Sequence, residues 1–138
     1  GIMVKTDIRY EGGLRCAATH GPSGQTLQTD APVDNHGRGE SFSPTDLVAT
    51  ALGACMATIM GIAAERHQLD LRGMQIEVTK VMSADLPRRI AKLITTIKVP
   101  LPPEHAQRAL LENAALTCPV HKSLSAEMEK PVDFEWVG

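Results

Sequence analysis

Aromatic side chains are scarce in this chain of 138 residues, because only 3% of them are Phe, Trp or Tyr. Proteins that bind single-stranded nucleic acid stack the bases on aromatic side chains, and so few scattered rings make a poor platform for stacking. The formal net charge of −2 also supplies no general attraction to phosphate groups or to an anionic membrane. The composition therefore predicts no nucleic-acid partner.

Cysteine is rare as well, and Cys16, Cys55 and Cys118 are the only three. They are too few and too widely spaced for the disulfide framework of a small secreted protein. The first residues also lack the basic and then apolar pattern of a signal peptide. We therefore expect a reducing compartment, the cytoplasm.

The spacing that metal ligands need is also missing. No two Cys or His residues stand in a C-x-x-C or H-x-x-x-H pattern, and Cys118 and His121 are the only close pair. No glycine-rich phosphate-binding motif follows an expected strand. We expect neither a metal ion nor another cofactor.

The remaining composition is that of a globular protein, with 43% apolar and 22% charged residues. The length fits a single domain over residues 1–138. Turn residues and hydrophobic periodicity predict strands over 3–10, 14–20, 25–30, 74–83, 88–99 and 131–137, and helices over 44–68, 104–116 and 119–128. Because the strands come in runs rather than alternating with helices, we expect an α+β fold with mostly antiparallel pairing.

The longest predicted helix has a clear start, which follows a long loop over 31–43. Ser43 is a good N-cap, and Pro44 fits the first helical position. Asp46, three residues after the cap, completes a pattern like a capping box.

The same helix contains 18 consecutive uncharged residues, Leu47–Ala64. A run of this length is just long enough for a helix that spans a membrane. The run has no aromatic belt and no flanking cluster of Lys or Arg. We therefore expect a helix buried in protein and no membrane partner.

Small residues recur every four positions along this helix, at Ala49, Gly53, Ala57 and Gly61. They form a ridge without bulk, which lets another backbone approach closely. Because the helix is apolar nearly all round, it has to be covered on every side. A partner chain in a two-fold dimer would supply that cover, and the alternative is cover by the helix over 104–116 alone.

The cysteines differ in their predicted positions. Cys55 lies inside the long helix, where it is either a small buried side chain or a nucleophile that needs a nearby cation. Cys118 precedes Pro119 at a predicted helix start, where exposed N–H groups favour a thiolate. Position alone therefore makes Cys118 the more reactive thiol, while Cys16 in a strand is expected to fill the core.

Two motifs together resemble the OsmC/Ohr family: Ser43–Cys55 (SPTDLVATALGAC) and, after 62 residues, Cys118–Val120 (CPV). The resemblance extends over essentially the whole chain. It implies an OsmC-like fold in which an antiparallel sheet surrounds two central helices of an intertwined homodimer. It also implies thiol-dependent reduction of organic hydroperoxides in oxidative stress defence.

The resemblance also implies a role for each thiol. Cys55 matches the peroxidatic cysteine, which attacks the peroxide and becomes a sulfenic acid. Cys118 matches the resolving cysteine, which condenses with it to a disulfide that an external dithiol, such as a lipoyl group, reduces. This reverses the ranking from helix position.

The chain departs from the family pattern in its charged residues. Many members carry an Arg and a Glu that activate the peroxidatic thiol, but the Glu position is Thr45 here and the acid is Asp46. Arg15 and Arg38 both resemble the activating Arg. Asp46 is otherwise a helix-start residue, and the two arginines are otherwise surface charges.

These departures leave two functions open. The first is a thiol peroxidase that uses Cys55 and Cys118. The second is a non-catalytic OsmC-like dimer that binds a small apolar ligand. For the peroxidase, Met56, Ile59 and Phe42 are the large apolar residues near Cys55 that we expect to line a small pocket for an organic hydroperoxide.

Overall fold

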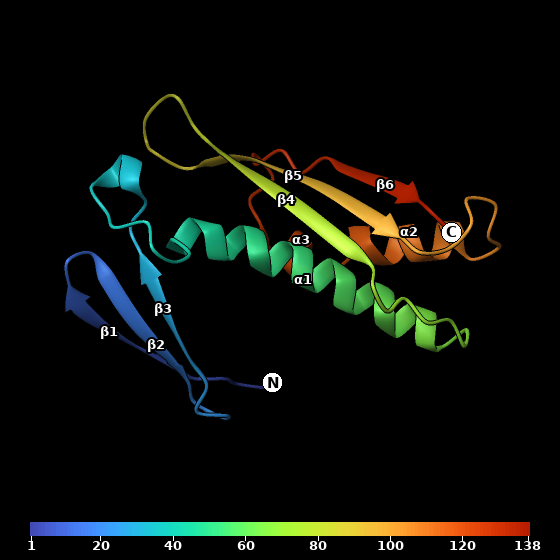
Figure 1. Cartoon of the computed structure of the whole chain (residues 1–138), viewed down its shortest axis with the longest axis horizontal. Helices are drawn as coiled ribbons and strands as arrows, with labels where there is room; N and C mark the ends of the chain where they lie inside the picture. Colours follow the sequence, from blue (N-terminus) through green and yellow to red (C-terminus); the bar gives the residue numbers. More distant parts are fainter. The chain divides into compact units, whose positions relative to one another are not determined.

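The computed structural model describes residues 1–138 and divides into two compact units, Gly1–Leu47 and Val48–Gly138. In the first unit, β1 (Thr6–Gly12), β2 (Arg15–His20) and β3 (Thr26–Asp30) form an antiparallel sheet in that order. A short 3-10 turn, η1 (Val33–Asn35), follows in the loop after β3 (Figure 1). The single domain expected from the length stays a prediction.

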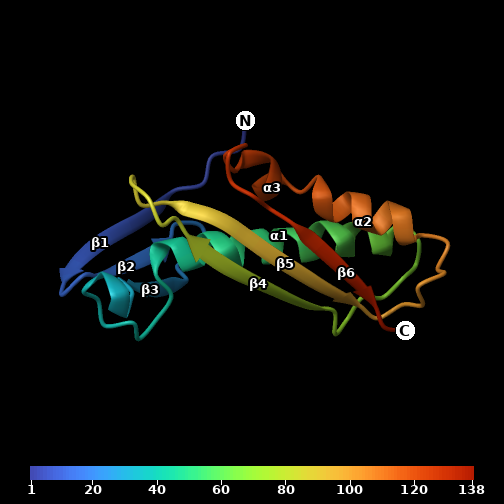
Figure 2. The ribbon, with the colours of Figure 1, turned by 90° about the horizontal axis from the view of Figure 1, so that it is seen from above.

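The second unit contains a second sheet with helices packed on one of its faces. Its elements are α1 (Pro44–Glu65, which starts in the last residues of the first unit), β4 (Gln75–Met82), β5 (Ile90–Val99), α2 (Arg108–Leu116), α3 (Pro119–Ser123) and β6 (Val132–Trp136). β5 lies in the middle, with β4 antiparallel and β6 parallel to it. Figure 2 shows α1 crossing behind β4 and β5.

The α+β class and the order of the strands and long helices are confirmed, but the sheet differs from the expectation. The chain forms two three-stranded sheets rather than one, and β6 is parallel to β5. The parallel pairing follows from the connection, because α2 and α3 carry the chain back across the sheet before β6 begins.

Several helix ends are also shifted. α1 ends at Glu65 rather than Gln68, because Gln68 has a left-handed backbone (φ 54°) and Leu69 N–H turns back to Ala64 O. α2 starts four residues later than expected, at Arg108, and α3 ends at Ser123 rather than 128. In the latter case the next residue is already extended, which stops the helix.

The core of the second unit lies between the sheet and α1. Met56, Met60, Leu93 and Ile97 are among its fully buried side chains. At Gly53 the helix approaches β4 so closely that an added Cβ would lie 3.1 Å from Val78 Cγ2 and 3.2 Å from Ile76 Cγ2. This part of the small-residue ridge therefore accommodates the sheet of the same chain rather than another helix.

We expect Gly53→Leu to lower the free energy of unfolding by about 1–3 kcal/mol, because the larger side chain has no room between α1 and β4. Urea denaturation measures the change. Gly61→Ala is the control, because no atom outside its own helix lies within 4 Å of the added Cβ. A Gly53→Leu protein as stable as the wild type would show that α1 and β4 are not in close contact.

α1 keeps one side uncovered within the chain. It is the one helix long and apolar enough to cross a membrane, and 33% of its 18-residue window is buried. Between its exposed end residues, Pro44 and Glu65, the exposed positions form a single stripe along the helix: Thr50, Ala51, Ala54, Thr58 and Ile62. The stripe carries small and apolar side chains, so it is suited to close packing against another surface.

Candidate functional site

The two thiols of the second unit are positioned by different elements. Cys55 comes from the middle of α1 and is partly exposed. Cys118 lies in the short connection between α2 and α3, where it has an extended backbone and caps the N-terminus of α3 ahead of Pro119. Its side chain is fully buried. The N-cap position predicted for Cys118 is therefore confirmed.

The fold brings these two thiols together. The side chains of Cys55 and Cys118 lie within hydrogen-bonding range of each other. The first turn of α3 adds a backbone donor to each sulfur: Val120 N–H lies 3.5 Å from Cys55 Sγ, and His121 N–H lies 3.4 Å from Cys118 Sγ. Amides in the first turn of a helix have no partner within the helix, so they are available to stabilise negative charge on sulfur.

Burial favours the protonated form of the Cys118 thiol. The pKa of the Cys118 thiol is raised, mainly because burial disfavours the thiolate and also because Cys55 is adjacent. The His121 amide acts in the opposite direction but does not outweigh burial. Cys118 is therefore a neutral thiol at neutral pH, which argues against the prediction from helix position that it is the more reactive one.

Arg15 in the first unit is held by a buried carboxylate. β2 and β3 pair Arg15 directly with Asp30. Arg15 Nε lies 2.7 Å from Asp30 Oδ1 and Nη2 lies 2.8 Å from Oδ2, while the Asp30 side chain is 0% exposed. Glu40 Oε1 accepts a further bond from Arg15 Nη2 at 3.2 Å, and Glu40 N–H donates to Asp30 Oδ2.

Arg38 belongs to the same cluster. Its guanidinium lies over Gly13, where an added Cβ would be 2.6 Å from Arg38 Nη2. Its charge also helps to hold the pKa of Asp30 below the usual range, although the Arg15 hydrogen bonds are the main cause. Both arginines singled out from the sequence thus gather around Asp30, a residue that the sequence reasoning missed. The strands expected over 14–20 and 25–30 could have revealed this partner, because a hairpin that joins them places residue 15 opposite residue 30.

Asp30 makes the first unit sensitive to acid. Its pKa is lowered in the folded chain, so its pairing with Arg15 stabilises the fold above the usual aspartate pKa of about 4. This contribution is lost as the pH falls through the lowered pKa. We expect Asp30→Asn to lower the melting temperature at pH 7 and to flatten its decline below about pH 4.

Thermal denaturation between pH 2 and pH 7 measures this effect. Asp7→Asn is the control, because the Lys5–Asp7 ion pair is 3.7 Å long and 69% or more exposed on both side chains. Unchanged melting at pH 7 in Asp30→Asn would contradict a stabilising role for the Arg15–Asp30 pair.

Asp46 completes the capping box predicted at the start of α1. Ser43 N–H donates to Asp46 Oδ2 at 2.9 Å, and Asp46 N–H donates to Ser43 Oγ at 3.1 Å. The structure thus gives Asp46 a helix-capping role. Its assignment as an acid that activates a thiol stays a prediction.

A groove of about 470 Å³ runs between α1 and α2. Ile59, one helical turn after Cys55, and Thr117, which precedes Cys118, both line it. Met56 packs in the core instead, so the expectation that it lines an open pocket is wrong. No group of three or more His, Cys, Asp or Glu side chains is placed to hold a metal ion.

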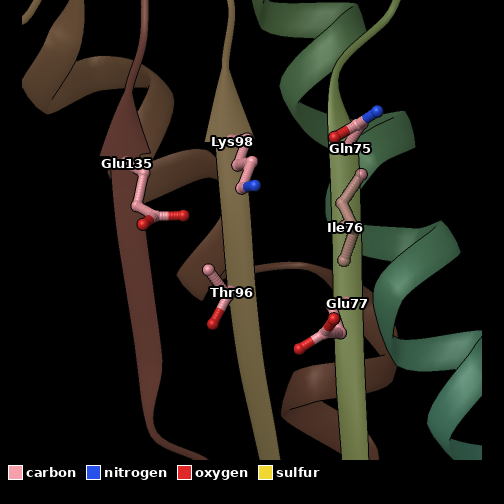
Figure 3. A pocket seen from close by; sticks show the side chains of 6 residues that line it. All are labelled: Gln75, Ile76, Glu77, Thr96, Lys98 and Glu135. Carbon is pink, nitrogen blue, oxygen red and sulfur yellow. The ribbon is translucent and has the colours of Figure 1, made fainter.

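A second hollow lies on the three strands of the second sheet, and neither thiol lines it. Figure 3 shows its side chains coming from β4, β5 and β6. Its volume is about 510 Å³, and the lining mixes carboxylates with one ammonium group: Gln75, Ile76, Glu77, Thr96, Lys98 and Glu135. It contains no thiol, so the Cys55–Cys118 pair is the stronger candidate for redox chemistry.

Comparisons with known proteins agree on one family. The sequence pattern of the family described as OsmC-like protein matches residues 37–131. A Psychrobacter arcticus protein, provisionally named an osmotic stress induced and detoxification response protein, is 43% identical over 97% of both chains, with a TM-score of 0.90. No match was found among curated protein sequences.

More distant structures share the fold. An organic hydroperoxide resistance protein OsmC from Legionella pneumophila is 14% identical over 97% of both chains, with a TM-score of 0.78. A Vibrio cholerae protein, provisionally identified as an organic hydroperoxide resistance protein, is 15% identical over 97% of this chain and 93% of its own, with a TM-score of 0.76. Its structure holds captopril in one of the active sites.

Proposed function

The chain belongs to the OsmC-like protein family, and from that premise we propose that it is a thiol-dependent peroxidase that reduces organic hydroperoxides. The observation that carries the proposal is the meeting of Cys55 and Cys118, which are separated by 62 residues in the sequence. Cys55 is partly exposed and receives the Val120 amide, whereas Cys118 is buried beside it. Cys55 can therefore contact a substrate, and Cys118 lies close enough to react with Cys55 afterwards.

In this function Cys55 and Cys118 act in sequence. The Cys55 thiolate attacks the peroxide O–O bond and becomes a sulfenic acid, while the peroxide is reduced to an alcohol. Cys118 then condenses with the sulfenic acid, which forms a disulfide and releases water. An external dithiol, such as a lipoyl group, restores both thiols by disulfide exchange. Arg15, Arg38 and Asp46 are candidates for tuning the Cys55 thiol on the family resemblance alone.

An organic substrate suits the groove next to the thiols, whose lining includes the neighbours of both cysteines but neither cysteine itself. Ile59, Ile62 and Leu110 form an apolar part of its wall, beside the polar side chains of Arg66, His67 and Asn113. A small organic molecule occupies an active site of the related Vibrio cholerae structure. Both observations favour an organic hydroperoxide over hydrogen peroxide.

We also propose that the protein is a homodimer whose contact includes the uncovered stripe of α1. Ala51 and Ala54 on this stripe allow close approach of another helix. The Thr58 hydroxyl already donates to Ala54 O at 2.8 Å, so it can be buried without losing a hydrogen bond. A second copy of the chain, meeting the first across a two-fold axis, would cover both stripes at once.

The alternative function is a non-catalytic dimer that holds a small apolar ligand. It is favoured by Thr45, which stands where the family resemblance calls for an activating Glu. In that case the thiols would be incidental to ligand binding.

Turnover of cumene hydroperoxide in the presence of dihydrolipoamide separates the two functions. The peroxidase account predicts catalytic consumption of peroxide, far above the rate with dihydrolipoamide alone. Consumption no faster than that background, together with a co-purified ligand in native mass spectrometry, would favour the binding protein.

A further inference from the structure

Cys118 is placed to do more than resolve a sulfenic acid. Its sulfur accepts the His121 N–H at 3.4 Å and lies within hydrogen-bonding range of Cys55. Its side chain is 0% exposed, so water does not reach its proton. The S–H group of Cys118 is thus adjacent to the sulfur at which the O–O bond of a peroxide breaks.

We propose that Cys118 is the general acid of the first step and hands its proton to the departing alkoxide. This inference rests on the proposed peroxidase function and adds a proton donor to it. A departing alkoxide is a strong base, and protonation as the O–O bond breaks lowers the barrier to its departure. Cys118 is therefore a catalytic residue before the disulfide forms.

The step balances as follows for a hydroperoxide ROOH. The Cys55 thiolate forms an S–O bond to the terminal oxygen, the O–O bond breaks, and RO⁻ takes the Cys118 proton to become ROH. Cys55 is oxidised to the sulfenic acid, and Cys118 is left as a thiolate. That thiolate then attacks Cys55 Sγ, the S–S bond forms, and hydroxide leaves and is protonated by solvent. One proton transfer thus completes the reduction and also generates the resolving nucleophile.

The protonation states in the site fit this role. Burial raises the pKa of Cys118, so the proton is present when the substrate arrives. The pKa of the His121 ring is lowered by burial and by Lys130 and Lys122, so this ring is uncharged at neutral pH. The Lys130 ammonium is bonded to Ser125 O and Met128 O.

The test compares two oxidants in a single turnover of the fully reduced protein. Cumene hydroperoxide releases an alkoxide, which needs a proton, whereas peracetic acid releases acetate, which needs none at neutral pH. The rate of Cys55 oxidation is followed in every variant by mass spectrometry, as the loss of the Cys55 thiol that can be alkylated, and dimedone traps the sulfenic acid in the Cys118 variants, which form no disulfide. Cys118→Ala removes the donor, and Cys16→Ala is the matched control, since it removes a cysteine from the other unit.

We expect Cys118→Ala to slow oxidation by cumene hydroperoxide about 100-fold, while oxidation by peracetic acid changes less than about threefold. Cys118→Ser, which keeps an O–H donor, should recover part of the rate with cumene hydroperoxide. Equal rates for wild type and Cys118→Ala, or equal slowing with both oxidants, would overturn the proposal. Wild-type protein whose Cys55 reacts with neither oxidant would instead contradict the peroxidase function.

Discussion

Replacing Cys55 with Ser is expected to lower catalytic consumption of cumene hydroperoxide by a factor on the order of 10³ or more, down to the rate of free thiol. Only a thiolate can attack the O–O bond and take up the oxygen as a sulfenic acid, and a serine hydroxyl does neither at neutral pH. Cys118 cannot substitute as the nucleophile, because burial raises the pKa of its thiol and keeps it protonated. The two thiols are therefore not interchangeable.

The matched control is Cys16→Ser. Cys16 is a free, half-buried cysteine in β2 of the first unit, and no step of the proposed reaction uses it. This variant should keep wild-type turnover. Substantial activity in Cys55→Ser would show that the peroxide is reduced elsewhere in the protein.

The second large effect is expected at the uncovered stripe of α1. Ala54→Glu should convert the dimer to a monomer, because a carboxylate would be buried in the contact without a partner. The penalty for an unpaired buried charge is about 3–5 kcal/mol, which is enough to weaken association more than 100-fold. Light scattering after size-exclusion chromatography measures the molar mass.

Thr79→Glu is the control for this change, because Thr79 is exposed on β4 and lies outside the stripe. It should leave the molar mass unchanged. A dimer that persists in Ala54→Glu at micromolar concentration would place the contact between copies on another surface.

Short sequence patterns predicted the fold well where contacts between residues close in the sequence determine the structure. The start of α1 is one case, because Ser43, Pro44 and Asp46 specify a capped helix through bonds that span three residues. The end of α1 was harder, since the left-handed backbone that ends the helix falls on Gln68 rather than on a glycine. The parallel pairing of β6 with β5 depends on a long connection, which no short pattern encodes.

In the candidate site, too, local patterns predicted some features and missed others. Helix position predicted that Cys118 caps a helix, but it could not predict that burial would outweigh the capping amide. The closeness of Cys55 to Cys118 came from the family resemblance, because a contact across 62 residues leaves no trace in local spacing. The cluster around Asp30 could have been inferred from the hairpin register, which pairs this residue with Arg15.

The Cys55–Cys118 redox pair is tested most directly by peptide mapping after one equivalent of cumene hydroperoxide. Reduced protein is exposed to the peroxide, free thiols are alkylated, and the digest is analysed by mass spectrometry without reductant. The account predicts a peptide that joins Cys55 to Cys118, with Cys16 alkylated. Recovery of both Cys55 and Cys118 as alkylated thiols, with the peroxide unconsumed, would contradict it.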